Sequence, residues 1–123
     1  YKRDPGAFYN RGLANQELGN YKEAIDDYKK SMTMDGKMYK ANTHNNIGYS
    51  YIQLEDYDNA LIHLNKAIEI KPKEGMFYSD KGDALYYLGK EDDACANYIK
   101  SSELGYEEIK DYLNSSDGDW CKK

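Results

Sequence analysis

Hydrophobic and polar residues follow one another along this chain with the period of an α-helix. Ile47, Tyr51 and Leu54 fall on a single helical face, and after a short polar turn Ala60 and Leu64 begin a second such face. Two amphipathic helices cannot bury their apolar faces alone. The pattern therefore predicts pairs of helices that stack on neighbouring pairs.

The same two-helix unit occurs three times. The spacing is 36 residues from Ala24 to Ala60 and 34 residues from Ala60 to Ala94. A glycine, an alanine and a large residue recur at fixed places, where small side chains let two helices approach closely and the large one fills the remaining space. These positions are Gly12, Gly48 and Gly82; Ala24, Ala60 and Ala94; and Tyr28, Leu64 and Tyr98.

This pattern resembles the tetratricopeptide repeat. Pro72 stands where that repeat has its closing proline, and the segment from Tyr9 to Ala14 is similar to the bacterial form of the motif. The resemblance implies an all-α fold, an α-solenoid of three helix-turn-helix repeats plus a C-terminal capping helix. The expected units are a single domain of residues 1–123 with repeats at 5–38, 41–74 and 75–108 and a cap helix and tail at 106–123.

The capping helix is expected at residues 106–114. Tyr106, Ile109 and Leu113 fall on one face, which would cover the apolar end of the last helix pair. The remaining residues are expected to be a polar tail with Trp120 as its one anchor.

Composition narrows the classes of function. The chain has 123 residues, of which 32% are charged, and a formal net charge of −5, which disfavours nucleic acid as a partner because phosphate binding needs a basic surface. No apolar run approaches the ~20 residues of a membrane helix, so no membrane span is expected. The chain opens with Tyr1 and without a signal segment, and we expect a processed or excised piece.

No group of residues predicts catalysis. His44 stands in a slot that this repeat fills with a large aromatic residue, and His63 has no second ligand at metal spacing. Neither a nucleophile motif nor a phosphate-binding glycine loop occurs. We therefore expect a protein that is not an enzyme and that needs neither cofactor nor metal.

Arg11 replaces an apolar residue inside a first helix and needs a partner. Asp27 lies where the second helix of the same repeat should oppose it, so we predict a structural ion pair between the two.

Two interpretations are open for the cysteines. Cys95 occupies a buried slot, so it can be a small core residue. The capping helix also returns the chain to the level of Cys95, which allows a disulfide with Cys121, provided the compartment is oxidising. The stretch from Asp93 to Cys121 resembles the last repeat of exported bacterial proteins of this family. That resemblance slightly favours an extracytoplasmic location, periplasmic or surface-anchored, over a cytoplasmic one.

What the family resemblance implies for function is the binding of a peptide or partner protein in the concave groove, which the first helices line. Asn10, Asn46 and Asp80 are equivalent positions and would form a polar ladder along its floor, because asparagine can both donate to and accept from a peptide backbone. The expected groove residues are Tyr9, Asn10, Leu13, Gln16 and Glu17 in repeat one; Asn42, Asn45, Asn46, Tyr49, Ile52 and Gln53 in repeat two; and Met76, Ser79, Asp80, Asp83, Tyr86 and Tyr87 in repeat three.

The charges of these residues indicate the kind of partner. Some family members clamp an acidic chaperone tail with basic and amide groups, and of that set this groove keeps only Asn46. Glu17, Asp80 and Asp83 are acidic and no base accompanies them. We expect a neutral or basic partner segment with an apolar anchor. The alternative is self-association, with the chain serving as an assembly scaffold within a larger protein.

Overall fold

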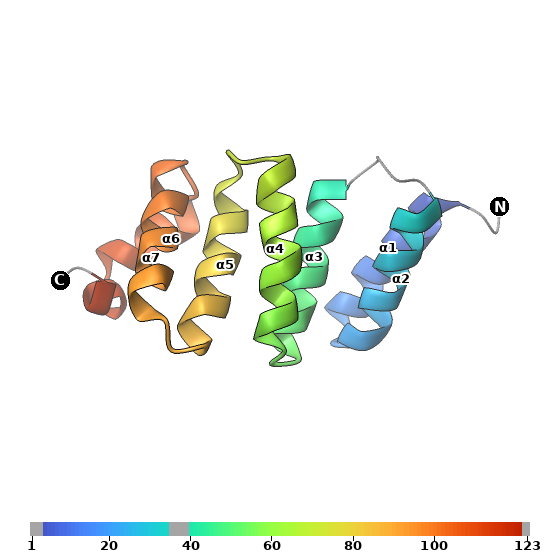
Figure 1. Cartoon of the computed structure of the whole chain (residues 1–123), viewed down its shortest axis with the longest axis horizontal. Helices are drawn as coiled ribbons and strands as arrows, with labels where there is room; N and C mark the ends of the chain where they lie inside the picture. Colours follow the sequence, from blue (N-terminus) through green and yellow to red (C-terminus); the bar gives the residue numbers. More distant parts are fainter. Residues whose placement is uncertain (1–3, 35–39, 122–123) are drawn as a thin grey trace.

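The computed structural model describes residues 4–34 and 40–121, and in these ranges every regular element is a helix (Figure 1). The all-α fold expected from the sequence is confirmed. Residues 35–38, expected to close the first repeat, lie outside the described residues, as do both ends of the chain. The elements are α1 (Pro5–Glu17), α2 (Tyr21–Met34), α3 (Lys40–Gln53), α4 (Tyr57–Ile70), α5 (Gly75–Tyr87), α6 (Glu91–Glu103), α7 (Glu107–Asn114) and the 3-10 helix η1 (Ser116–Cys121).

Local sequence signals fix where the helices begin and end. Asp4 caps α1 by accepting a hydrogen bond from the backbone N–H of Gly6 at 2.9 Å, and Pro5 follows where no donor is needed. The chain leaves α1 through Gly19, whose φ of 83° is a left-handed conformation that glycine adopts without steric cost. Glu55 occupies the equivalent position after α3 with a φ of 61°.

Each first helix lies closely against the second helix of its own pair. A Cβ atom at Gly12 would lie 2.7 Å from the Tyr28 ring, and one at Gly82 would lie 2.6 Å from the Tyr98 ring. No side chain fits at those distances. The recurrent glycines and large residues are thus two halves of one contact, as the repeat pattern predicted.

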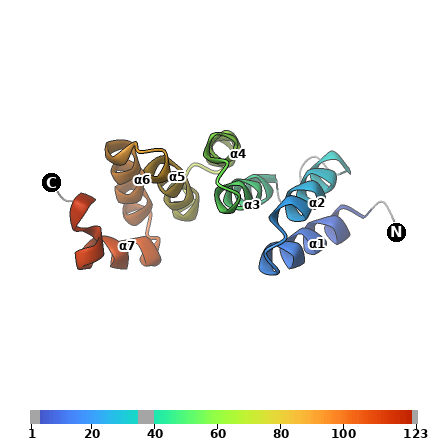
Figure 2. The same ribbon diagram turned by 90° about the horizontal axis from the view of Figure 1, so that it is seen from below.

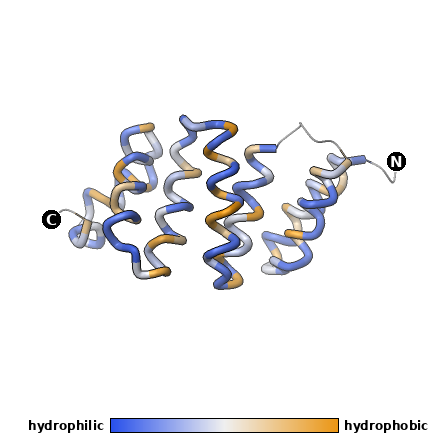
Figure 3. The backbone as a smooth tube through the Cα atoms, viewed as in Figure 1, coloured by the Kyte–Doolittle hydropathy of each residue, from blue (hydrophilic) through white to orange (hydrophobic). Residues whose placement is uncertain are grey.

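The helix pairs stack into an elongated arc with the two termini at opposite ends (Figure 1). The first helices α1, α3 and α5, followed by α7, line the concave side, which faces downward in Figure 2. Hydrophobic and hydrophilic positions alternate along the helices, as their amphipathic character requires (Figure 3). None of the helices in the described ranges is both long and apolar enough to cross a membrane.

The C-terminal segment is more ordered than the sequence indicated. Ile109 of α7 is buried against Leu85 and Tyr98, in agreement with its expected capping role. The expected polar tail is instead the helix η1, which folds back so that the Trp120 indole N–H donates to the Tyr112 hydroxyl at 2.7 Å. Trp120 anchors this segment as expected, but the segment is not a tail with a single anchor, because residues 116–121 form a helix in which Gly118 and Cys121 are also buried.

Arg11 and Asp27 form the predicted ion pair, but the buried group that needs a partner is Asp27 and not Arg11. The guanidinium donates twice to the carboxylate, from Nη2 at 2.7 Å and from Nε at 3.0 Å. The Arg11 side chain is 61% exposed, whereas that of Asp27 is 5% exposed. The Arg11 hydrogen bonds, together with one from Asn15, lower the pKa of Asp27. The group that depends on the pair is thus the carboxylate.

Cys95 of α6 and Cys121 of η1 are joined by a disulfide in the structure, with their Cα atoms 5.3 Å apart. The bond links the last repeat to the end of the described chain. We predict that the same bond forms in solution under oxidising conditions.

Candidate functional site

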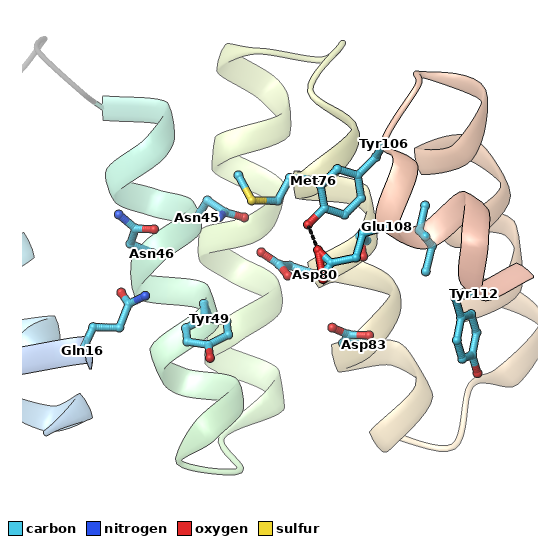
Figure 4. A pocket seen from close by; sticks show the side chains of 12 residues that line it. Gln16, Asn45, Asn46, Tyr49, Met76, Asp80, Asp83, Tyr106, Glu108 and Tyr112 are labelled. Atoms are coloured by element: carbon cyan, nitrogen blue, oxygen red, sulfur yellow. Dashed lines mark hydrogen bonds between the residues drawn. The ribbon is translucent and has the colours of Figure 1, made fainter. Parts of the chain in front are cut away.

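A pocket of about 470 Å³ opens on the concave side between α3, α5 and the cap (Figure 4). Helix α5 contributes Met76, Asp80 and Asp83, which share one face because they are four and three residues apart. Asp80 lies between Asn45 of α3 and Glu108 of α7, as Figure 4 shows. The lining residues are Gln16, Asn45, Asn46, Tyr49, Met76, Ser79, Asp80, Asp83, Tyr106, Glu108, Ile109 and Tyr112.

The structure gathers all the residues expected from repeat three and half of those from repeat two, and it leaves most of repeat one aside. Tyr86 and Tyr87 line a smaller adjoining pocket of about 230 Å³, which also includes Asp83. Ile52 is 7% exposed and packs in the core against Leu64, so its expected place in the groove is wrong. Six further expected groove residues line neither of these two pockets: Tyr9, Asn10, Leu13, Glu17, Asn42 and Gln53.

The expected ladder of polar side chains is interrupted. Asn10 is exposed on α1 and is not part of the pocket, whereas Asn46 and Asp80 both line it. The Asn46 amide donates to the Tyr9 hydroxyl at 3.3 Å, so Tyr9 orients a groove residue from a neighbouring helix.

The capping helix supplies one wall of the pocket, which was not expected from the sequence. Tyr106, Glu108 and Tyr112 come from the N-cap and body of α7 and face the concave side. The Tyr106 hydroxyl donates to Glu108 at 2.8 Å (Figure 4). The sequence did contain a signal for this wall. Helix α7 follows the third pair at the place where the first helix of another repeat would stand, and first helices line the groove.

Carboxylates dominate the electrostatics of the pocket. Burial raises the pKa of Asp80 to about 7, the nearby charges of Asp83 and Glu108 contribute to the rise, and a hydrogen bond from Asn45 opposes it. Burial also raises the pKa of Asp83, which accepts a short hydrogen bond from the Tyr98 hydroxyl. No lysine or arginine is among the lining residues described. The pocket therefore favours positive charge.

The histidines lie apart from this pocket, between α3 and α4. The Nδ1 atoms of His44 and His63 are 3.1 Å apart, and burial lowers the pKa of each to about 4. Both rings are neutral at pH 7, so one can donate to the other. Within the described ranges, no group of three or more His, Cys, Asp or Glu residues could hold a metal ion.

An arc of stacked helix pairs with a polar groove on its concave side defines an α-solenoid protein. The family is also established from sequence: a family model described as Tetratricopeptide repeat matches residues 5–73, more than half of the chain. This chain belongs to the tetratricopeptide repeat family.

Alignments with curated proteins cover most of this chain. It is 28% identical over 127 residues to the Photosystem I assembly protein Ycf3 of a strain of Prochlorococcus marinus, an alignment that covers 89% of this chain and 73% of the relative. The protein of the same name from Synechococcus sp. (strain WH7803) is 25% identical over the same shares.

The expectation of an extracytoplasmic location is wrong. The relatives that match along 89% of the chain are named for photosystem I assembly and not for export or surface anchoring. The expectation depended partly on the cysteine pair. Two cysteines come close because η1 packs on α6, and that proximity says nothing about the compartment.

Solved structures share the fold. The first tetratricopeptide domain of Spaghetti (RPAP3), bound to the HSP90 peptide SRMEEVD, is 25% identical, with a TM-score of 0.77 over 94% of this chain and 97% of that one. The first such domain of human RPAP3 is 27% identical, with a TM-score of 0.80 over 89% and 87%. Domains of this family bind peptides and partner proteins.

Proposed function

We propose that this protein is a non-catalytic interaction module that binds a segment of a partner protein in its concave pocket. The observation that carries this proposal is the pocket itself, which combines aromatic walls, such as Tyr49 and Tyr112, with the carboxylates of Asp80 and Asp83. Tyrosines supply contact area at a low entropic cost, and the polar groups fix the orientation of the ligand.

The proposed partner segment is neutral or basic and carries an apolar anchor. Met76 is 39% exposed and Tyr86 is 42% exposed, so apolar area is available on this side of α5. The peptide bound by the RPAP3 domain, SRMEEVD, has three acidic residues. Asp80, Asp83 and Glu108 would repel such a sequence, so we propose a partner of a different chemistry.

The names of the curated relatives support a role in assembly. Those proteins are called photosystem I assembly proteins. We propose that this chain likewise holds a client protein while a larger complex is built. Three repeats make a short groove, which suits reversible binding with a dissociation constant expected near ~1 μM.

The test is capture of partners from the native host with the wild-type chain and matched variants. Asn46→Ala should weaken binding by about 1–3 kcal/mol, because it leaves a polar group of the partner unpaired. Asp80→Lys should reduce capture of a basic partner, most strongly at low salt. Asp26→Lys makes the same charge change at an exposed position of α2 and should leave capture unchanged.

Lys30 of the same helix is also exposed, but it is a less suitable position for this control. Its ammonium lies 5.7 Å from the centre of the Phe8 ring, and its charge helps to lower the pKa of Asp27. If Asp26→Lys abolishes capture while both pocket variants retain it, the binding surface is not the concave pocket and the proposal fails.

A further inference from the structure

One buried polar atom in the concave pocket has no hydrogen-bond partner among the residues that the structure describes. Asn45 is 4% exposed, and its side-chain Oδ1 accepts no hydrogen bond from any described residue, whereas the other end of the amide bonds to Asp80. The side chain points toward Asp80 in Figure 4. A buried acceptor without a donor is unfavourable, so such an atom in a pocket indicates a missing ligand group.

The neighbours of Asn45 are two carboxylates on one face of α5. Asp80 and Asp83 are one turn apart, so their side chains are adjacent. The Asp83 carboxylate has the Tyr98 hydroxyl as a donor, and Asp80 has only the Asn45 amide among the hydrogen bonds described. Asp80 and Asn45 therefore face the pocket with acceptor capacity that is not used.

We infer that this corner of the pocket is a subsite for a positively charged side chain, lysine or arginine, of the bound partner segment. The inference rests on the proposed function, because the cation arrives on the segment that the pocket binds. An ammonium or guanidinium group would donate to Asp80, Asp83 and the Asn45 Oδ1 together, whereas a neutral amide has fewer donors and no charge.

The surrounding rings fit the stem of such a side chain. Tyr49 and Tyr106 line the same pocket, and the apolar Met76 lies beside Tyr106 (Figure 4). Methylene groups pack on aromatic faces, and the negative face of a ring also attracts a cation. The subsite thus provides both apolar and charged contacts, while Glu108 adds negative charge at the rim.

The test uses small probes and nuclear magnetic resonance of the ¹⁵N-labelled full chain. The probes are the Nα-acetyl amides of lysine and arginine, with that of norleucine as the uncharged control of similar length. We expect at least one cationic probe to shift the side-chain amide signals of Asn45 in a saturable way, and norleucine to leave them unchanged.

Variants test which residues form the subsite. Asp80→Asn should weaken the cationic probe by about tenfold, the factor that corresponds to one charge-assisted hydrogen bond. The variant should fold, since the raised pKa shows that this site already favours an uncharged group. Asp83→Asn should also weaken the probe, and Asp26→Asn, a matched change at an exposed site, should have no effect.

Any of three results would overturn the inference. They are equal binding of norleucine and lysine, equal affinity in the Asp80→Asn and wild-type chains, and no shift with either cationic probe. The proposed function is judged separately, by partner capture. If capture depends on Asn46 but not on Asp80, the pocket binds a partner without a cationic anchor, and only the inference fails.

Discussion

Single residues show how the same side chain acquires opposite properties in two places. Asp27 is buried beside a guanidinium, and the Arg11 hydrogen bonds lower its pKa. Asp80 is enclosed by acidic neighbours, and burial raises its pKa to about 7. The first carboxylate is charged and structural, whereas the second changes its charge near neutral pH and faces a pocket.

Arg11→Met should destabilise the fold more than Asp27→Ala. It leaves the buried Asp27 with only the Asn15 amide, and a buried acceptor that loses its partner costs about 1–3 kcal/mol. Asp27→Ala frees an exposed guanidinium that can turn to water. The check is chemical unfolding at pH 7, with Asp26→Ala as the control. The pKa of Asp27 is lowered by folding, so the cost of Arg11→Met should shrink as the pH falls below the ordinary value of 3.8. Equal costs for all three variants would contradict the ion pair.

Asp80→Asn should stabilise the protein, and more so at high pH. The folded state holds the Asp80 proton more tightly than the unfolded state, so the contribution of Asp80 to stability is present below pH 3.8 and is lost as the pH rises through about 7. Each pH unit of separation corresponds to about 1.4 kcal/mol, so the gain should reach a few kcal/mol at pH 8.

The measurement is the melting temperature of wild type and variant at pH 5 and pH 8. Asp83, Glu108 and Tyr106 face Asp80 from α5 and the cap, and all three are the same in both proteins, so the comparison isolates Asp80. A gain that does not change with pH would show that Asp80 is not destabilised by its charge.

At the scale of helices, stability comes from contacts between an element and its neighbours. Gly12 and Gly82 allow the first and third pairs to close on a tyrosine ring, and α7 with η1 then covers the third pair. Because a helix pair cannot bury its own apolar face, α7 and η1 stabilise the last described pair by covering it.

Ile109→Ala tests the cap. Ile109 is 7% exposed, and removal of three buried carbons should cost about 2–4 kcal/mol. Ile99→Ala removes the same atoms from α6, where the side chain is 43% exposed, and should cost much less. Thermal unfolding of both variants gives the comparison. Similar melting temperatures would mean that α7 does not stabilise the array.

Reduction of the Cys95–Cys121 disulfide tests how far that bond stabilises the packing of η1 on α6. Closure of a 26-residue separation should stabilise the folded state by about 3 kcal/mol. The oxidised protein should therefore melt at a lower temperature in the presence of a thiol reductant, and a Cys121→Ser variant should show no such dependence. Two free thiols by Ellman titration after mild oxidation would instead show that Cys95 is only a core residue.

At the scale of the whole molecule, the arc has unlike ends. Trp120 and α7 cover the C-terminal end, whereas α1 and α2 form the other. Head-to-tail stacking of solenoids needs two open ends that fit each other. Because α7 and η1 cover the third pair, we expect that this face takes no part in head-to-tail stacking.

We expect a monomer over a wide concentration range. Sedimentation or size-exclusion measurements at several concentrations should give one mass, close to that of a single chain. A mass that rises with concentration would revive the alternative of an assembly scaffold.

The sequence by itself determined the helix pairs, their close contacts and the Arg11–Asp27 pair. These depend on spacing within one repeat, since residues three or four apart share a helical face and equivalent residues oppose each other in every pair. Tertiary structure decided which concave residues meet. The curvature of the stack places α7 as a wall of the pocket and leaves Asn10 and Gln53 outside it, whereas the packing of α4 and α5 on α3 buries Ile52. The raised pKa of Asp80 also arises only in the folded chain, because burial and the charge of Glu108 come from elements far apart in sequence.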